Sequence, residues 1–240
     1  MNKLSRAALA VLLCALLSSC AVAQEDAGAL EAAEPLRGSL AWGEGDTAVS
    51  LAYALPQFDA HTESDAAINA HYQAMAQQLE AGEPDADEDA LIELDYEITH
   101  SSERYVSVAL YRYMMGGVTE TQTLSADTFA RDGVYAGQPV TLTQVLGLEE
   151  DAEGESQAEL LAVELVWQIV QRDSQNMDRD YLDGLTRERV AAAFTPETDF
   201  YLDADGNVVF FIQSGVIAGE VAGLLLYPFS PAEMLSALAQ

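Results

Sequence analysis

Cysteine is nearly absent from this chain. Of its 240 residues only two are cysteine, Cys14 and Cys20, and both lie close to the N-terminus. Cys14 falls inside an apolar segment typical of an export signal, so we expect it to be removed with that segment. The exported chain then holds no disulfide, and its stability must come from a hydrophobic core. A chain of this length is long enough to form one.

Positive charge is scarce as well. Lysine and arginine number 10 against 40 aspartate and glutamate residues, which gives a formal net charge of −30, and the one lysine is Lys3. A field of this sign repels the phosphates of nucleic acids and anionic membrane surfaces, which excludes a DNA- or RNA-binding protein. Solubility is the simpler explanation of such a charge, and attraction of a cationic partner is the alternative.

The apolar run near the N-terminus is too short to span a membrane. It covers residues 7–17 and follows Lys3 and Arg6, a combination typical of a signal peptide. Residues 17–20 (LSSC) resemble a lipobox, so residues 1–19 are predicted to be a lipoprotein signal peptide and Cys20 the lipidated residue. The small residues that follow offer an alternative cleavage site, at Ala23, which would give a secreted protein.

Lipidation of Cys20 would attach the protein to the bacterial cell membrane on its extracytoplasmic side, without a transmembrane helix. Residues 20–37 are rich in alanine and glutamate and lack an apolar period, so we interpret them as the lipidated cysteine and an acidic tether. The folded part is expected to begin at Gly38.

Catalytic signatures are missing from the sequence. The histidines are His61, His71 and His100, and no zinc-protease, nucleophile-elbow, phosphate-loop or dinucleotide motif occurs. His71 lies beside the apolar stripe of a predicted helix and is interpreted as a half-buried or surface residue. Residues 203–207 (DADGN) resemble the opening of a calcium loop, but the strand-like VVFFIQ that follows favours a hairpin turn. We expect no enzymatic activity, no cofactor and no metal; a cell-wall-modifying hydrolase with an unrecognised carboxylate site is the alternative.

Apolar periodicity predicts a succession of strands and helices. Strands are expected at residues 47–58, 91–99, 105–115 and 118–129, as a strand–turn–strand at 198–213, and within 219–229. Helices are expected at residues 62–82, 155–173, 186–194 and 230–240, with a short helical segment ending near Gly147. Neighbouring strands joined by short turns imply antiparallel pairing. The predicted fold is therefore α+β, with one or more antiparallel sheets and helices packed on one face.

A pair of glycines, Gly116 and Gly117, separates two of the expected strands. Glycine accepts positive φ without strain, so the pair predicts a hairpin corner. The threonines of the returning strand recur with period two and form a candidate contact surface. The candidate ligand contacts are Tyr113, Thr119, Thr121, Thr123, Gly219 and Glu220.

Several segments, taken in order, resemble a known family. Most of them resemble the exported C-terminal domain of RsiV-type anti-sigma factors. These segments are residues 106–129, residues 137–147, a long amphipathic helix, residues 199–223 and residues 227–234. Residues 49–58 and 67–72 are similar to the smaller module that precedes that domain and that also occurs in PdaC-type peptidoglycan deacetylases. The resemblance implies an N-terminal PdaC-like module at 38–102 and an RsiV-like domain at 103–240.

The resemblance also implies a non-catalytic, extracytoplasmic α+β protein, and the RsiV-type receptors bind lysozyme. Three departures stand out. Residues 118–120 (VTE) replace a stretch in which the family often has a histidine, Gly219 and Glu220 replace a Pro-Tyr pair, and the sequence shows no transmembrane or sigma-binding segment. We therefore expect no inhibition of a sigma factor. The expected function is binding of a protein, with lysozyme as a candidate, or of a cell-wall ligand; a structural envelope lipoprotein is a further alternative.

Overall fold

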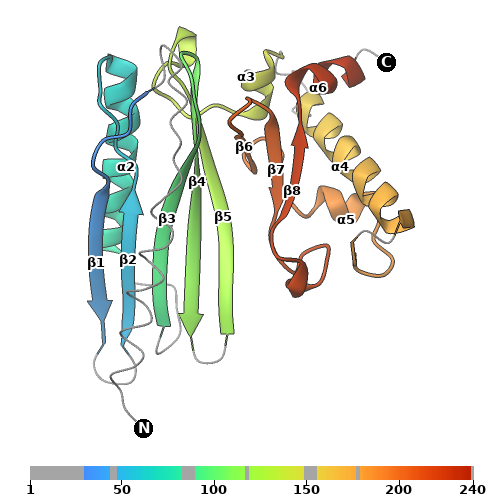
Figure 1. The fold of residues 1–240 in the computed structure, drawn as a ribbon, viewed down its shortest axis with the longest axis horizontal. Helices are drawn as coiled ribbons and strands as arrows, with labels where there is room; N and C mark the ends of the chain where they lie inside the picture. The colour runs from blue at the N-terminus through green and yellow to red at the C-terminus, as the bar shows by residue number, and fades with distance from the viewer. Residues whose placement is uncertain are drawn as a thin grey trace.

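The computed structural model describes residues 30–43, 48–82, 90–116, 119–148, 156–176 and 179–238. They form two β-sheets with associated helices (Figure 1), which confirms the expected α+β class. The larger sheet has five strands in the order β1-β2-β3-β4-β5, and the smaller has three in the order β6-β7-β8. The strands of the larger sheet are β1 (Leu36–Trp42), β2 (Val49–Leu55), β3 (Ala90–Ser101), β4 (Tyr105–Gly116) and β5 (Thr119–Ala130).

Helix α2 (Glu63–Ala81) covers one face of the larger sheet. It begins with a capping box in which the Thr62 side chain and Asp65 satisfy each other's backbone N–H groups. Its buried residues Ile68 and Tyr72 are both 0% exposed and pack on the apolar row of β4 that the sequence predicted, which includes Val106 and Val108. The row and the helix stripe therefore form one core.

The N-terminal edge of the larger sheet differs from the sequence-based expectation. β1 was not predicted, and Leu30, only 5% exposed, already packs in the core, so the chain joins the folded part before Gly38. The apolar alternation of β1 is interrupted at Gly38, which stands where the pattern requires an apolar side chain. A Cβ at this position would lie 2.3 Å from the ring of Tyr53. The ring of Tyr53 lies over this glycine and takes the place of its missing side chain.

One strand pair is parallel rather than antiparallel. β2 and β3 run in the same direction, with Leu51 opposite Ile92, and α2 lies between them in the chain. A parallel pair needs a crossover connection, and here the predicted helix supplies it. The other neighbours in both sheets are antiparallel.

The smaller sheet carries the remaining helices on its outer face (Figure 1). Its strands are β6 (Phe200–Leu202), β7 (Val208–Ile212) and β8 (Leu225–Phe229). The helices are α3 (Leu142–Leu146), α4 (Gln157–Asn176), α5 (Arg187–Ala191) and α6 (Pro231–Leu238), and a single turn, η3 (Glu220–Ala222), precedes β8. Another single turn, η2 (Gly133–Tyr135), follows β5 of the larger sheet. Val166 and Val170 of α4 pack with Phe210 and Ile212 of β7 in one hydrophobic core.

The two sheets pack against each other through the faces that carry no helix. Ala109 and Leu124 of the larger sheet form a small cluster with Phe211 of β7. The buried hydroxyl of Ser107 lies 2.8 Å from that of Thr128 and accepts the N–H of Leu202 at 3.0 Å. The boundary expected at residues 102/103 falls in the turn between β3 and β4, so both expected modules contribute strands to the larger sheet.

Candidate functional site

Part of the inward face of the larger sheet is left uncovered by the smaller sheet. β4 is 12 residues long and β7 only 5, so β3–β5 extend beyond β6–β8 (Figure 1). Side chains alternate between the faces of a strand, and the residues that share this face with Ala109 continue along β3 and β4. They include Glu93, Asp95, Glu97 and Tyr113, together with Tyr111 at the border, where it packs against the cluster that contains Phe211 of the smaller sheet. We call these five residues the open face.

Carboxylates and phenol rings lie side by side on the open face. Glu93 pairs with Tyr113 and Asp95 with Tyr111 across the β3–β4 ladder. The two tyrosine rings are stacked, with centroids 6.5 Å apart and an angle of 23° between their planes. The Tyr111 hydroxyl donates a hydrogen bond to Glu97 Oε2 at 3.3 Å. The face therefore joins three acids to two aromatic surfaces.

The electrostatics of the open face favour a cationic group. Burial raises the pKa of Tyr113, and the neighbouring Asp95 and Glu93 carboxylates raise it further. Burial and the Glu97 carboxylate likewise raise the pKa of Tyr111. Both phenols are thus neutral at pH 7. A guanidinium or ammonium group can pair with a carboxylate and lie on a ring at the same time.

The candidate contacts from the sequence do not share one surface. Tyr113 lies on the open face, and the Gln122 amide donates a hydrogen bond to its hydroxyl at 3.1 Å. Thr121 and Thr123 flank Gln122 in β5 and therefore point to the opposite face of the sheet. Thr119 pairs with Gly116 at the start of β5.

The other two expected contact residues lie in the smaller-sheet half, away from β4 and β5. Gly219 and Glu220 are exposed at the η3 turn of the smaller-sheet half. The expected hairpin between β4 and β5 is confirmed, whereas Gly117, Val118 and Cys20 lie outside the described residues.

The acids of the open face were missed by sequence reasoning. Apolar residues alternate along the strand expected at 91–99, at Ile92, Leu94, Tyr96 and Ile98. The same alternation places the intervening Glu93, Asp95 and Glu97 together on the other side. The sequence does not show the strand order, which places these three acids beside the tyrosines of β4.

His71 and His100 contact neighbouring side chains and the backbone within the fold. His71 is half-buried, with Nε2 3.4 Å from Asp127 Oδ2 and its ring edge-on to that of Tyr72. The His100 ring nitrogens lie 2.9 Å from the carbonyl of Asp203 and 3.1 Å from the hydroxyl of Ser102. Across the described ranges, no three His, Cys, Asp or Glu side chains are grouped to hold a metal ion.

The DADGN segment forms the expected hairpin turn. Asp203 Oδ1 accepts the N–H groups of Asp205 and Asn207 at 3.0 and 2.9 Å, and Oδ2 accepts the Asn207 amide at 2.9 Å. Gly206 supplies the positive φ, at 78°. The Asp203 carboxylate is thus used within the turn.

Comparison with known proteins shows a shared fold. No protein-family profile and no curated protein matches the chain. A crystal structure of a DUF3298 family member from Bacteroides fragilis superposes with a TM-score of 0.53 at 12% identity, covering 88% of this chain and 100% of the other. A DUF3298 family protein from Pseudomonas aeruginosa is also similar, with a TM-score of 0.49, 12% identity and coverage of 86% and 93%. In the part of the chain that the structure describes, no helix is long and apolar enough to cross a membrane.

Proposed function

We propose that this protein is a bacterial extracytoplasmic lipoprotein whose folded part is a non-catalytic binding module for a cationic protein, with lysozyme as the candidate partner. The observation that carries the proposal is the open face, where Glu93, Asp95 and Glu97 lie beside two stacked tyrosines. Aromatic residues are enriched in protein interfaces, and a negative field steers basic partners toward the surface. The net charge of −30 and the resemblance to RsiV-type receptors favour the same class of partner.

The test measures lysozyme binding by calorimetry at low and at physiological salt, about 0.15 M. The variant Glu93→Gln/Asp95→Asn/Glu97→Gln removes three charges from the open face. We expect it to lose about tenfold in affinity, since each exposed charge pair contributes up to about 1 kcal/mol. The matched control removes three charges from exposed acids outside the open face: Asp59→Asn/Glu103→Gln/Asp132→Asn.

The aromatic part of the open face has its own pair of variants. Tyr113→Ala is expected to weaken binding, whereas Tyr135→Ala, at an exposed tyrosine of η2, is expected to leave it unchanged. No lysozyme binding at either salt concentration would refute the lysozyme assignment. Equal losses for the two triple variants would refute the open face as the contact. Release of soluble fragments from peptidoglycan would instead favour the hydrolase alternative.

Lipid attachment is tested separately at Cys20. The full chain expressed in a bacterium is expected in the membrane fraction, and the Cys20→Ala variant in the soluble fraction, since the acyl chains supply the anchor. Membrane association that survives the substitution would refute the lipoprotein assignment.

A further inference from the structure

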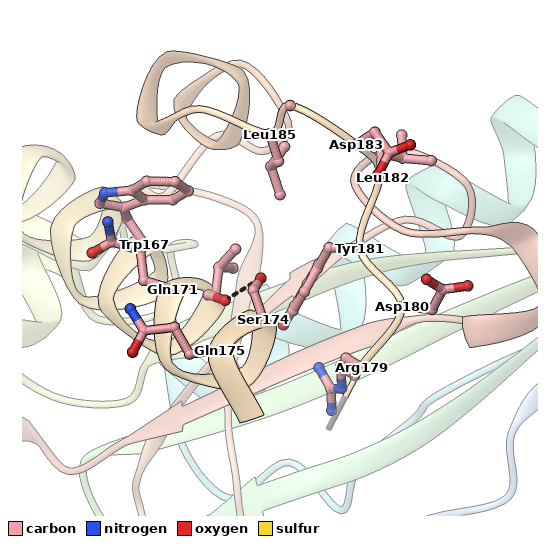
Figure 2. Close-up of a pocket in the computed structure, with 12 residues that line it drawn as sticks. Trp167, Gln171, Ser174, Gln175, Arg179, Asp180, Tyr181, Leu182, Asp183 and Leu185 are labelled. Atoms are coloured by element: carbon pink, nitrogen blue, oxygen red, sulfur yellow. Dashed lines mark hydrogen bonds between the residues drawn. The ribbon is translucent and has the colours of Figure 1, made fainter. Parts of the chain in front are cut away.

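A groove on the helical side of the smaller sheet is separate from the open face. It has a volume of about 710 Å³ and lies between the second half of α4 and the segment 179–185 (Figure 2). Trp167, Gln171 and Gln175 follow one another at four-residue spacing, so they share one side of α4. Tyr181 and Leu185 come from the opposite wall (Figure 2).

The walls of the groove are held by contacts outside it. Tyr181 pairs with Ala218 in a β-bridge, and the N–H of Leu182 donates to the carbonyl of Ile217 at 3.0 Å. The Tyr181 hydroxyl lies 3.3 Å from that of the buried Tyr227, and the Arg179 guanidinium lies 5.8 Å from the centre of the Tyr227 ring. The segment opposite α4 is therefore fixed before any ligand arrives, as in most small-molecule sites.

The lining combines an aromatic surface with neutral and charged hydrogen-bonding groups. The Trp167 indole is half-buried, and the amides of Gln171 and Gln175 are exposed beside it. Arg179, Asp180 and Asp183 also belong to the lining, and the two aspartate side chains point away from α4 (Figure 2). An amide both donates and accepts hydrogen bonds, so the hydroxyl groups of a ligand find both kinds of partner at Gln171 and Gln175.

This combination selects one class of ligand. A lipid tail would offer the amides no hydrogen-bond partner, and a polyphosphate would be repelled by a strongly negative protein. A sugar ring offers an apolar C–H face to the indole and hydroxyls to the surrounding polar groups. The volume falls within the range of small-molecule sites, about 300–1,000 Å³. We propose that the groove lined by Trp167, Gln171, Gln175 and Tyr181 binds a short oligosaccharide.

The experiment uses the two tryptophans of the chain, Trp42 and Trp167, of which only Trp167 lines the groove. In the full chain carrying Trp42→Phe, titration with N-acetylglucosamine tetramers or with cellotetraose is expected to change the indole emission. The same titration of a chain carrying Trp167→Phe is expected to leave the emission of Trp42 unchanged.

Surface glutamines of α4 provide variants that preserve the fold. Gln171→Ala/Gln175→Ala is expected to weaken the saccharide about tenfold, because two hydrogen-bonding side chains are lost. Gln168→Ala, at an exposed glutamine outside the groove lining that bonds to Glu164, is the matched control and is expected to bind as the parent does. No emission change with either sugar, or equal affinity in the double variant and the parent, would overturn the proposal.

The two binding proposals are separable. The saccharide titration repeated in the open-face variant Glu93→Gln/Asp95→Asn/Glu97→Gln is expected to be unchanged, since those residues line no part of the groove. Lysozyme binding is likewise expected to survive Gln171→Ala/Gln175→Ala. Loss of saccharide binding in the open-face variant would contradict an independent groove site.

Discussion

Replacing Asp65 with alanine should be one of the most destabilising single changes in the larger-sheet half. The Asp65 side chain is 0% exposed, and Arg131 Nε donates to its Oδ1 at 3.2 Å. The N–H groups of His61 and Thr62 donate to Oδ2 at 3.2 and 3.1 Å. Arg131 also donates to the carbonyl of Ser102 at 2.6 Å. One carboxylate thus holds the start of α2 to the end of β5 and the β3–β4 turn.

The expected cost follows from these contacts. Removing one partner of a buried ion pair costs about 3–5 kcal/mol, and Asp65→Ala falls at the low end because Arg131 keeps its bond to Ser102. Loss of the capping box adds to this, so the free energy of unfolding should fall by about 3–4 kcal/mol. For a chain of this size that lowers the melting temperature by roughly 6–16 °C.

Urea denaturation followed by circular dichroism measures the difference, with an unchanged slope expected for both proteins. Arg172→Ala is the control, because Arg172 also pairs with an acid, Asp173, but its side chain is 65% exposed. An exposed pair contributes less than about 1 kcal/mol. A loss below about 1 kcal/mol for Asp65→Ala would refute the assigned role of this contact.

The pH dependence gives a second readout of the same contact. Burial alone would raise the pKa of Asp65, but hydrogen bonds from Thr62, His61 and Arg131 outweigh it and lower the pKa below its ordinary 3.8. A lowered folded-state pKa contributes stability that is present above the unfolded pKa and is lost as pH falls through the folded one. The difference between wild type and Asp65→Ala should therefore be complete at pH 6 and shrink below about pH 4. A difference that stays constant down to pH 2 would contradict this origin.

Two further changes test the packing of loops on helices. Gly137→Ala should cost clearly more stability than Gly133→Ala. The two glycines have the same backbone strain, with φ of 77° and 76°, but a Cβ at 137 would lie 2.7 Å from a methyl group of α2, whereas nothing lies within 4 Å of one at 133. Equal melting temperatures of the two variants would contradict the close approach. Glu197→Gln should lower the free energy of unfolding by about 1–3 kcal/mol, because the Glu197 carboxylate accepts hydrogen bonds from the N–H and the hydroxyl of Thr143 at 3.0 and 2.6 Å. Glu103→Gln, at an exposed site, is the control. Equal shifts of the urea midpoint in the two variants would refute the stabilising role of these hydrogen bonds.

Periodicity was sufficient to predict most of the secondary structure. The strand β4 and the helices α2 and α6 were predicted because the apolar row of β4, the buried stripe of α2 and the Ser230–Glu233 cap of α6 each depend on residues close in sequence. β1 was hidden because the ring of Tyr53 completes the row where Gly38 has no side chain. That contact joins two strands, so no local pattern contains it.

The candidate sites were less accessible to sequence reasoning. Glu93 and Asp95 could have been placed on one face of a strand, but their proximity to Tyr113 and Tyr111 depends on the register of β3 against β4. The groove depends on the irregular segment 179–185, which has no period of two or of 3.6 residues. Its position is set by the bridge to Ala218, a contact between distant parts of the chain.

The strand order of both sheets has a consequence for folding. In each sheet the strands lie side by side in the order in which they occur in the chain. β3, β4 and β5 follow one another in the chain with few residues between them, so this meander pairs with little loss of chain entropy and is expected to form early. β2 pairs with β3 across the longer connection that contains α2, so this parallel pairing closes a larger loop and is expected to form later. β1 and β2 are thus expected to dock after the meander, and we expect β2 to stay unpaired on that side until β3 has formed.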